Sequence, residues 1–118
     1  MASVWPISAS MQSLMGRFNE FVTEIPVDAL LAGAQVVYDR SQELVPVDTG
    51  FLKSSGYIQV QGDDVQVGYD ADYASAVEYG TYKMEAQPFL RPAMDENEEE
   101  ILSAVGSKII DWEFQALQ

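Results

Sequence analysis

The side chains of this sequence that could do chemistry are carboxylates, hydroxyls and six basic groups. Asp63 with Asp64, and Asp70 with Asp72, are close acidic pairs of the kind that could bind a divalent cation or, in principle, hydrolyse a glycoside. Both pairs lie in stretches with turn composition, where a carboxylate is explained by hydrogen bonds to nearby backbone. Because the chain holds nineteen acidic residues, some close pair is unavoidable, and neither pair indicates an active site.

The other routes to catalysis are weaker still. Lys53 and Ser54 would form a catalytic dyad only inside a pocket, and the Gly-Lys-Ser/Thr element of a phosphate-binding loop is missing. The chain has no cysteine and no histidine, which excludes disulfides, thiol nucleophiles and the commonest general base and metal ligand. We therefore expect no catalytic residues, no cofactor-binding residues and no metal site, and predict that the protein is not an enzyme.

Nineteen acidic and six basic residues give a formal charge of −13. A protein so charged repels phosphate backbones and does not bind nucleic acid nonspecifically. The charge is consistent with three alternatives: solubility, a surface past which nucleic acid slides without sticking, or a mimic of DNA. The densest acidic run, residues 95–100, is best explained as a solvated face near a helix start, because it lacks the spacing and the glycine of a calcium loop.

A length of 118 residues predicts one domain, and no apolar run is long enough to span a bilayer. Residues 1–10 show no clear period and are expected to be a flexible arm, followed by a single domain over residues 11–118. Apolar residues then recur at helical spacing over residues 11–25 and 30–45. Pro26 separates these two helices and is expected in the first turn of the second, with Thr23 as a candidate cap. Pro46 ends the second helix.

The apolar period changes to two after a turn at residues 48–50. Residues 51–61 and 65–69 are predicted to pair as a β-hairpin, and a third short strand is a weaker prediction at residues 81–86. A short helix over residues 73–79, capped by Asp72 and ended by Gly80 in the left-handed conformation, precedes a loop. A last helix begins near Pro88 or Phe89, with Pro92 in its first turn. The predicted fold class is α+β, a small antiparallel sheet packed against long helices that include a C-terminal helix.

Apolar residues extend beyond one helical stripe at both ends of the chain, at Trp5, Phe21, Phe114 and Leu117. One small core does not need this much apolar helix surface. We interpret it as a sign of subunit contacts, with burial in the core as the alternative.

Three sequence blocks, taken together, resemble one family. They are Val45-Pro46-Val47-Asp48-Thr49-Gly50 with Leu52, Lys53 and Ser55; Tyr73-Ala74 with Val77-Glu78-Tyr79-Gly80-Thr81; and Gln87-Pro88-Phe89-Leu90-Arg91-Pro92-Ala93-Met94. In this order they are similar to the neck or tail-completion proteins of Hong Kong-97-like siphophages, a tail-component family. The resemblance extends over roughly residues 27–112, as judged from these blocks.

The resemblance implies a structural protein of the phage head–tail junction, without catalysis or cofactor. It would assemble into or onto a ring of six or twelve copies that joins the capsid connector to the tail, with DNA passing through and no membrane involved. Its partners would be other neck, connector and tail proteins. The protein would reside in the virion, and in the host cytoplasm before assembly. The alternatives are a tail terminator, a tail-assembly chaperone and, in a different class, an acidic DNA-mimic inhibitor.

Structural and interface roles are expected for the matched positions. Asp48 and Thr49 would hold the helix-to-strand turn, for which Gly50 would supply an unusual dihedral angle. Arg91 would pair with Glu78 or with a neighbour's carboxylate, unless it is an ordinary surface charge. The remaining candidates, expected to shape the fold and an interface, are Pro46, Tyr73, Tyr79, Gly80, Pro88, Phe89 and Pro92.

Overall fold

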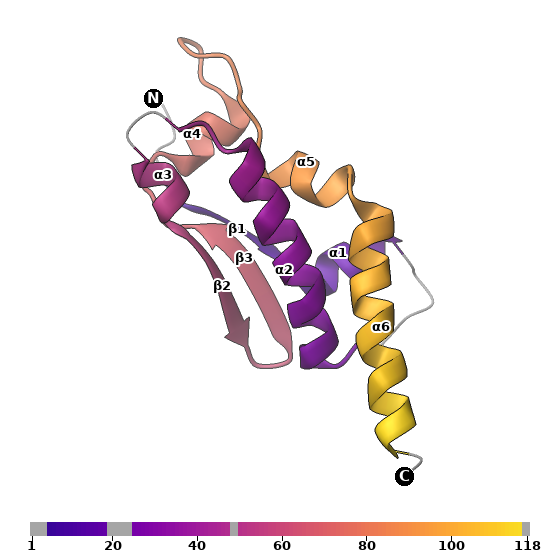
Figure 1. Ribbon diagram of the computed structural model, residues 1–118. Helices are drawn as coiled ribbons and strands as arrows, with labels where there is room; N and C mark the ends of the chain where they lie inside the picture. The colour runs from indigo at the N-terminus through magenta and orange to yellow at the C-terminus, as the bar shows by residue number, and fades with distance from the viewer. Residues whose placement is uncertain (1–4, 19–24, 48–49, 117–118) are drawn as a thin grey trace.

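The computed structural model describes residues 5–18, 25–47 and 50–116 (Figure 1). For residues 111–116 it describes the helix backbone alone. In chain order its elements are β1 (Ile7–Ser10), α1 (Met11–Phe18), α2 (Val27–Leu44), α3 (Phe51–Ser54), β2 (Gly56–Gln61), β3 (Asp64–Tyr69), α4 (Ala74–Tyr79), α5 (Leu90–Asp95) and α6 (Glu98–Ala116). The predicted α+β class, with an antiparallel sheet and a C-terminal helix, is confirmed.

The sheet has three antiparallel strands in the order β1-β3-β2. Alternate residues of the central strand, Val65, Val67 and Tyr69, are fully buried, because that face of the sheet packs against α2. The opposite face is polar where Gln66 lies between Ser10 and Gln59 in the register. This alternation is why the period of two over residues 65–69 predicted the strand, which the structure extends to Asp64.

Helix α2 joins the sheet to the C-terminal helices. It packs against β2 and β3 and also against α5 and α6 (Figure 1). Its buried residues Leu30, Ala34 and Val37 belong to the same cluster as Ile101 and Val105 of α6. The helical spacing in residues 27–44 therefore marks a helix that is buried on more than one side, at the centre of the fold.

The prediction of a flexible arm over residues 1–10 is wrong for residues 7–10, which form edge strand β1. Ile7 pairs with Tyr69 and Ala9 with Val67, so both apolar side chains lie on the helix-covered face of the sheet. Four residues are too few to show a clear period in the sequence, and the partner strand lies far along the chain. Residues 1–4 lie outside the described part of the chain.

Two predicted strands are also corrected. The first residues of the segment 51–61 form the short helix α3, because Ser54 and Ser55 donate backbone hydrogen bonds to the carbonyls of Gly50 and Phe51. The strand begins only at Gly56. Residues 81–86 contain an isolated bridge between Thr81 and Met84 in place of a strand, and β1 is the third strand of the sheet.

The predicted last helix is two helices. Asn97 interrupts it: its side-chain amide donates to the carbonyl of Ala93, and its own carbonyl accepts from Ile101 in the first turn of α6. Asparagine favours such a position, and the three glutamates that follow it suit the positive end of the helix dipole. Pro92 lies in the first turn of α5, as predicted.

The caps of the other helices also differ from the prediction. Pro26 occupies the cap position of α2 itself and lies one residue before its first turn, while Thr23 lies outside the described residues. The N-cap position of helix α4 is occupied by Tyr73, and no side chain makes a hydrogen bond to the start of the helix there. Asp72 therefore does not cap it.

Candidate interaction surface

The end of α2 and the following turn build one side of a groove. Val45 ends the helix by donating its amide to the carbonyl of Ser41, and Pro46 cannot continue it. Gly50 has φ +84°, a conformation that glycine adopts without steric cost, so its predicted unusual dihedral is confirmed. From there α3 directs Leu52 inward, where it is buried. Asp48 and Thr49 lie outside the described residues.

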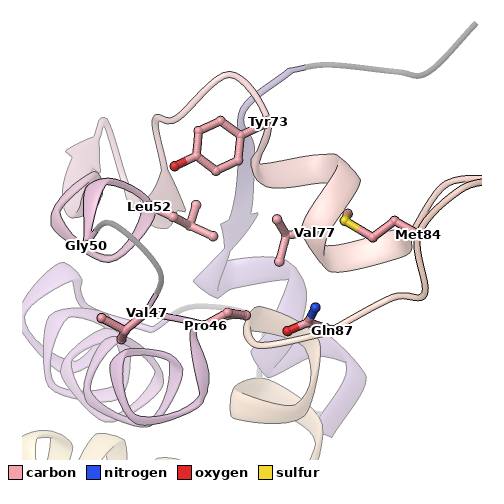
Figure 2. A pocket seen from close by; sticks show the side chains of 8 residues that line it. All are labelled: Pro46, Val47, Gly50, Leu52, Tyr73, Val77, Met84 and Gln87. Atoms are coloured by element: carbon pink, nitrogen blue, oxygen red, sulfur yellow. The ribbon is translucent and has the colours of Figure 1, made fainter.

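The groove has a volume of about 490 Å³ and lies between the end of α2, α3, α4 and the segment after α4. Figure 2 shows Leu52, Tyr73 and Val77 on one side, Pro46 and Val47 on another, and Met84 with its sulfur toward Val77. Its lining is Pro46, Val47, Gly50, Leu52, Tyr73, Val77, Met84 and Gln87. A hollow of this size, lined mainly by apolar groups, suits apolar side chains of a partner.

The elements around the groove expose large apolar side chains to solvent. Val47 is 65% exposed and Tyr82 is 84% exposed, and Phe51 and Tyr79 are also more than half exposed. Phe51 contacts the ring of Tyr73, with ring centroids 6.1 Å apart. We call Val47, Phe51, Tyr79 and Tyr82 the groove rim. Exposed apolar groups gathered in this way are typical of an interaction surface.

Glu78 holds the helix α4 against the start of α5. Its side chain is 1% exposed, and its carboxylate accepts the backbone amides of Phe89, Leu90 and Arg91, at 2.8 Å for Leu90. The guanidinium of Arg91 donates to the same carboxylate from Nε at 3.2 Å and to the Glu78 carbonyl at 3.0 Å. The predicted pairing of Arg91 with Glu78 is therefore confirmed. Arg91 also lies over the ring of Tyr79, 4.7 Å from its centroid.

Residues 81–88, which we call the tongue, project from the end of the molecule where α3 and α4 lie (Figure 1). The tongue is fixed at both ends: Thr81 and Met84 exchange backbone hydrogen bonds, and the amide of Gln87 donates to the carbonyl of Val77. Gly80 begins it with φ +79° and ψ 172°, so the predicted positive φ is confirmed but the backbone is extended rather than left-handed helical. A Cβ at Gly80 would lie 2.7 Å from the backbone nitrogen of Ala86.

The structure thus brings the described candidate residues into two neighbouring groups. Pro46, Gly50 and Tyr73 line the groove, whereas Glu78, Tyr79 and Arg91 form the ion-paired contact beside it. Phe89 is buried and packs edge-on against Tyr69, with centroids 4.8 Å apart. Pro88 is exposed in the tongue, and the carbonyl of Pro92 accepts the amide of Glu96 at the end of α5.

The lining residues Leu52 and Val77 belong to the sequence blocks quoted above, but Met84 carries no sequence signal for its position in the groove. It comes to the groove because the tongue folds back at Thr81.

A polar contact that the sequence did not indicate fixes β1 and α1 to the hairpin. Asp64 accepts hydrogen bonds from the hydroxyl of Ser10, the amides of Gln12 and Val65 and the side chain of Gln66. Burial by itself raises the pKa of Asp64, but these hydrogen bonds together outweigh burial and hold the pKa below its ordinary value.

Tyr69 anchors α2 on the sheet. Its hydroxyl bonds to Ser41 at 2.6 Å and accepts from Gln42 at 2.9 Å. Burial raises the pKa of Tyr69, against the effect of these two hydrogen bonds. The network fixes the strand and helix that support the groove.

Within the described residues, His, Cys, Asp and Glu side chains do not gather in any group of three that could hold a metal ion. Across the same part of the chain, none of the helices combines the length and apolar character needed to cross a membrane.

Comparison with known proteins gives one result that bears on these features. Residues 8–80 match a family model described as "Bacteriophage HK97-gp10, putative tail-component". Searches of curated proteins and of solved structures give no match. The matched range includes the first sequence block, the second block up to Gly80 and strand β1 from Ser8, whereas the third block at residues 87–94 lies beyond it. The match extends over more than half of the chain, which therefore belongs to the HK97-gp10-like family of bacteriophage tail components.

Proposed function

We propose that this protein is a structural component of the phage head–tail junction. Copies assemble into or onto a ring that joins the capsid connector to the tail. The observation that carries the proposal is the apolar groove with its exposed rim, in a member of a tail-component family. Such a surface supports association with other phage structural proteins, because exposed apolar area is stabilised when a partner covers it.

The role is one of shape and contact. The polar groups beside the groove are used within the chain, as the Glu78 carboxylate is by α5 and Arg91. The side chains that remain accessible around the groove are mainly apolar. We therefore propose that the protein performs no catalysis and that its groove binds side chains of a neighbouring subunit.

The charge of −13 supports passage of DNA through such a ring. The first turn of α6 carries Glu98, Glu99 and Glu100, all exposed. Glu100 is paired with Arg40, so the carboxylates here without an ion pair to another described residue are those of Glu98 and Glu99. Facing the bore of the ring, they repel the phosphate backbone, so DNA passes without adhering. A map of the ring in the virion with a neutral or basic bore would contradict this orientation.

Deletion of the gene, followed by imaging and mass spectrometry of the particles, tests the proposal. We expect filled heads and tails that fail to join, restored by the wild-type gene, and the protein in wild-type particles at the copy number of one ring. Absence of the protein from normal particles would indicate an assembly chaperone, and tails of abnormal length would indicate a terminator. Normal infectious particles without the gene would refute the proposal.

A further inference from the structure

Strand β2 is an edge of the sheet that lacks the features with which proteins usually protect an edge. It pairs with β3 on one side, and no other strand of the described residues pairs with it (Figure 1). Natural edge strands are very short, or carry a lysine, a proline or a bulge that stops another strand from pairing with them. Over its six residues β2 has no charge and no proline, and its register with β3 runs unbroken from Gly56 to Gln61. Such an edge favours pairing with a further strand.

The other edge strand, β1, is better protected. It has only four residues and follows Pro6. Just before it, the carbonyl of Trp5 accepts the amide of Ser75, so the backbone there is already bonded to α4. The unprotected edge of the sheet is therefore β2.

The backbone groups that β2 offers to a partner follow from its hydrogen bonds to β3. Ser55, just before the strand, accepts the amide of Asp70. Hydrogen-bonded positions alternate along an antiparallel ladder, so the odd-numbered residues of β2 bond to β3. Ile58 and Val60 consequently direct their amides and carbonyls away from the sheet. The side chain of Val60 is also 48% exposed.

The sequence of β2 fits a second copy of itself. When two β2 strands pair antiparallel, an outward-facing residue must lie opposite an outward-facing residue to form hydrogen bonds. A pair centred on Gln59 places Ile58 of each copy opposite Val60 of the other. The two Gln59 side chains then meet on the open, polar face of the sheet, where Gln59 lies beside Gln66. Apolar groups cover the exposed part of Val60, and amide meets amide.

Charge at the two ends of the strand supports the antiparallel direction. Asp63 is exposed at the tip of the hairpin, where the carboxylate of Asp64 is already held by Ser10. In the pair centred on Gln59, Asp63 lies opposite Ser55 of the second copy, two residues from Lys53. Lys53 is exposed and forms no ion pair with another described residue. The strand itself brings no charge into the contact, although each copy carries −13.

We propose that β2 of one copy pairs with β2 of a second copy, antiparallel and centred on Gln59, so that two sheets join into one. The contact relates identical surfaces by a two-fold axis and therefore closes on itself. It makes the free protein a dimer. No residue of β2 lines the groove, so this contact is separate from those that the proposed ring requires, and the tests below do not depend on the proposed function.

Cysteine cross-linking tests both the pairing and its register, because the native chain contains no cysteine. Gln59→Cys places one thiol from each copy beside the two-fold axis, and we expect a disulfide-linked dimer on mild oxidation. The matched control is Gln61→Cys, exposed on the same face of the same strand. Its two thiols are four residues apart along the strand, about 13 Å, which is too far for a disulfide. No linkage of Gln59→Cys, or equal linkage of both variants, would overturn the proposal.

Sedimentation equilibrium measures the association without a cross-link. Val60→Lys should weaken dimer formation by about tenfold or more, because a lysine on an edge strand opposes pairing. Ile110→Lys adds the same charge at an exposed apolar residue of α6 and should dimerise like the wild-type chain. Circular dichroism verifies that both variants fold. Equal weakening by both variants would overturn the contact. So would a wild-type chain that stays monomeric at its highest soluble concentration, which would leave the edge to a strand of a different protein.

Amide hydrogen exchange shows whether the backbone makes the contact. The amides of Ile58 and Val60 should exchange more slowly as the protein concentration is raised through the dimerisation range. The amide of Gln59, which bonds to β3 in the single copy, should change less. A dimer in which the exchange of Ile58 and Val60 stays as fast as in the monomer would show that side chains elsewhere hold the copies together, and would overturn the pairing.

Discussion

Glu78 is almost completely buried, and its carboxylate accepts hydrogen bonds from backbone amides at the start of α5 and from the guanidinium of Arg91. A buried carboxylate is costly unless hydrogen bonds compensate it, and here three backbone amides and a guanidinium do so. The partner amides would otherwise be the unpaired donors of a helix start. The residue therefore fixes α4, the tongue and α5 relative to one another, and with them one side of the groove.

Replacing Glu78 by alanine should lower the free energy of unfolding by roughly 2–4 kcal/mol, because it leaves buried amide donors without a partner. Urea denaturation of the wild-type chain and the variant measures this difference. Glu85→Ala, which removes an exposed carboxylate from the tongue, is the matched control, expected to change stability by less than about 0.5 kcal/mol. Equal stability of the two variants would show that the buried carboxylate does not hold α5.

Asp64 provides a prediction with a pH dependence. Its pKa is lower in the folded protein than in the unfolded chain, so the stabilisation it contributes is present above its unfolded pKa of about 3.9 and is lost as pH falls through the lowered folded value. Asp64→Asn should therefore cost about 1 kcal/mol near neutral pH, and the difference from wild type should shrink as the solution is acidified below about pH 4. Urea denaturation at a series of pH values measures this, and a difference that is constant with pH would contradict it.

Sequence reasoning found one of these two carboxylates. Glu78 and Arg91 stand out because each lies in a sequence block that resembles the family, and an acid and an arginine invite pairing. Asp64 looked like one of two adjacent turn aspartates, since its partners lie more than fifty residues away. Ser10 is at the end of the segment predicted to be a flexible arm, and Gln12 is at the start of the first predicted helix. Such a contact depends on how β1 pairs with β3, which local composition does not reveal.

At the scale of elements, Gly80 connects α4 to the tongue in a conformation that other residues reach only with strain. Gly80→Val should cost roughly 2–4 kcal/mol, because backbone strain adds to the overlap of a Cβ with the backbone of Ala86. Gly50→Ala tests strain alone, since open space surrounds that position, and should cost about 1 kcal/mol. Thermal or urea denaturation measures both.

The control for this series is Gly106→Ala, in the body of α6, where no atom would meet the added methyl group. It should raise stability by about 0.5–1 kcal/mol, as alanine favours a helix interior over glycine. A Gly80→Val variant as stable as Gly106→Ala would show that the tongue adjusts its backbone freely and does not have a fixed shape.

The elements of six or more residues were mostly predictable from the sequence, including the short helix α4, whereas the four-residue elements were not. Residues 27–44 and 64–69 show many repeats of one period because they pack against several neighbours. Strand β1 and helix α3 have four residues each, too few to display any period, and their conformations depend on β3 and on Gly50. The groove was not predictable as such, because its lining comes from three elements and the tongue, and only their packing brings Leu52, Val77 and Met84 together.

At the scale of the whole molecule, two features oppose each other. The apolar groove would favour the proposed association of copies, whereas a charge of −13 on every copy opposes it. Exposed cation–carboxylate pairs between copies would contribute at most about 1 kcal/mol each. The net repulsion acts over a longer range and dominates the electrostatic free energy of assembly when salt is scarce.

The proposed association of copies should therefore become stronger as salt is added. The distance over which charges interact falls from about 30 Å at 0.01 M salt to about 8 Å at 0.15 M, which removes the long-range repulsion and leaves the apolar contact. Sedimentation over this range should show a larger assembled fraction at the higher salt concentration. Glu98→Gln combined with Glu99→Gln lowers the charge at exposed positions away from the groove, and should assemble more readily at low salt with a weaker dependence on it. If assembly instead weakens as salt is added, attraction between opposite charges would be the dominant interaction, because screening reduces that attraction.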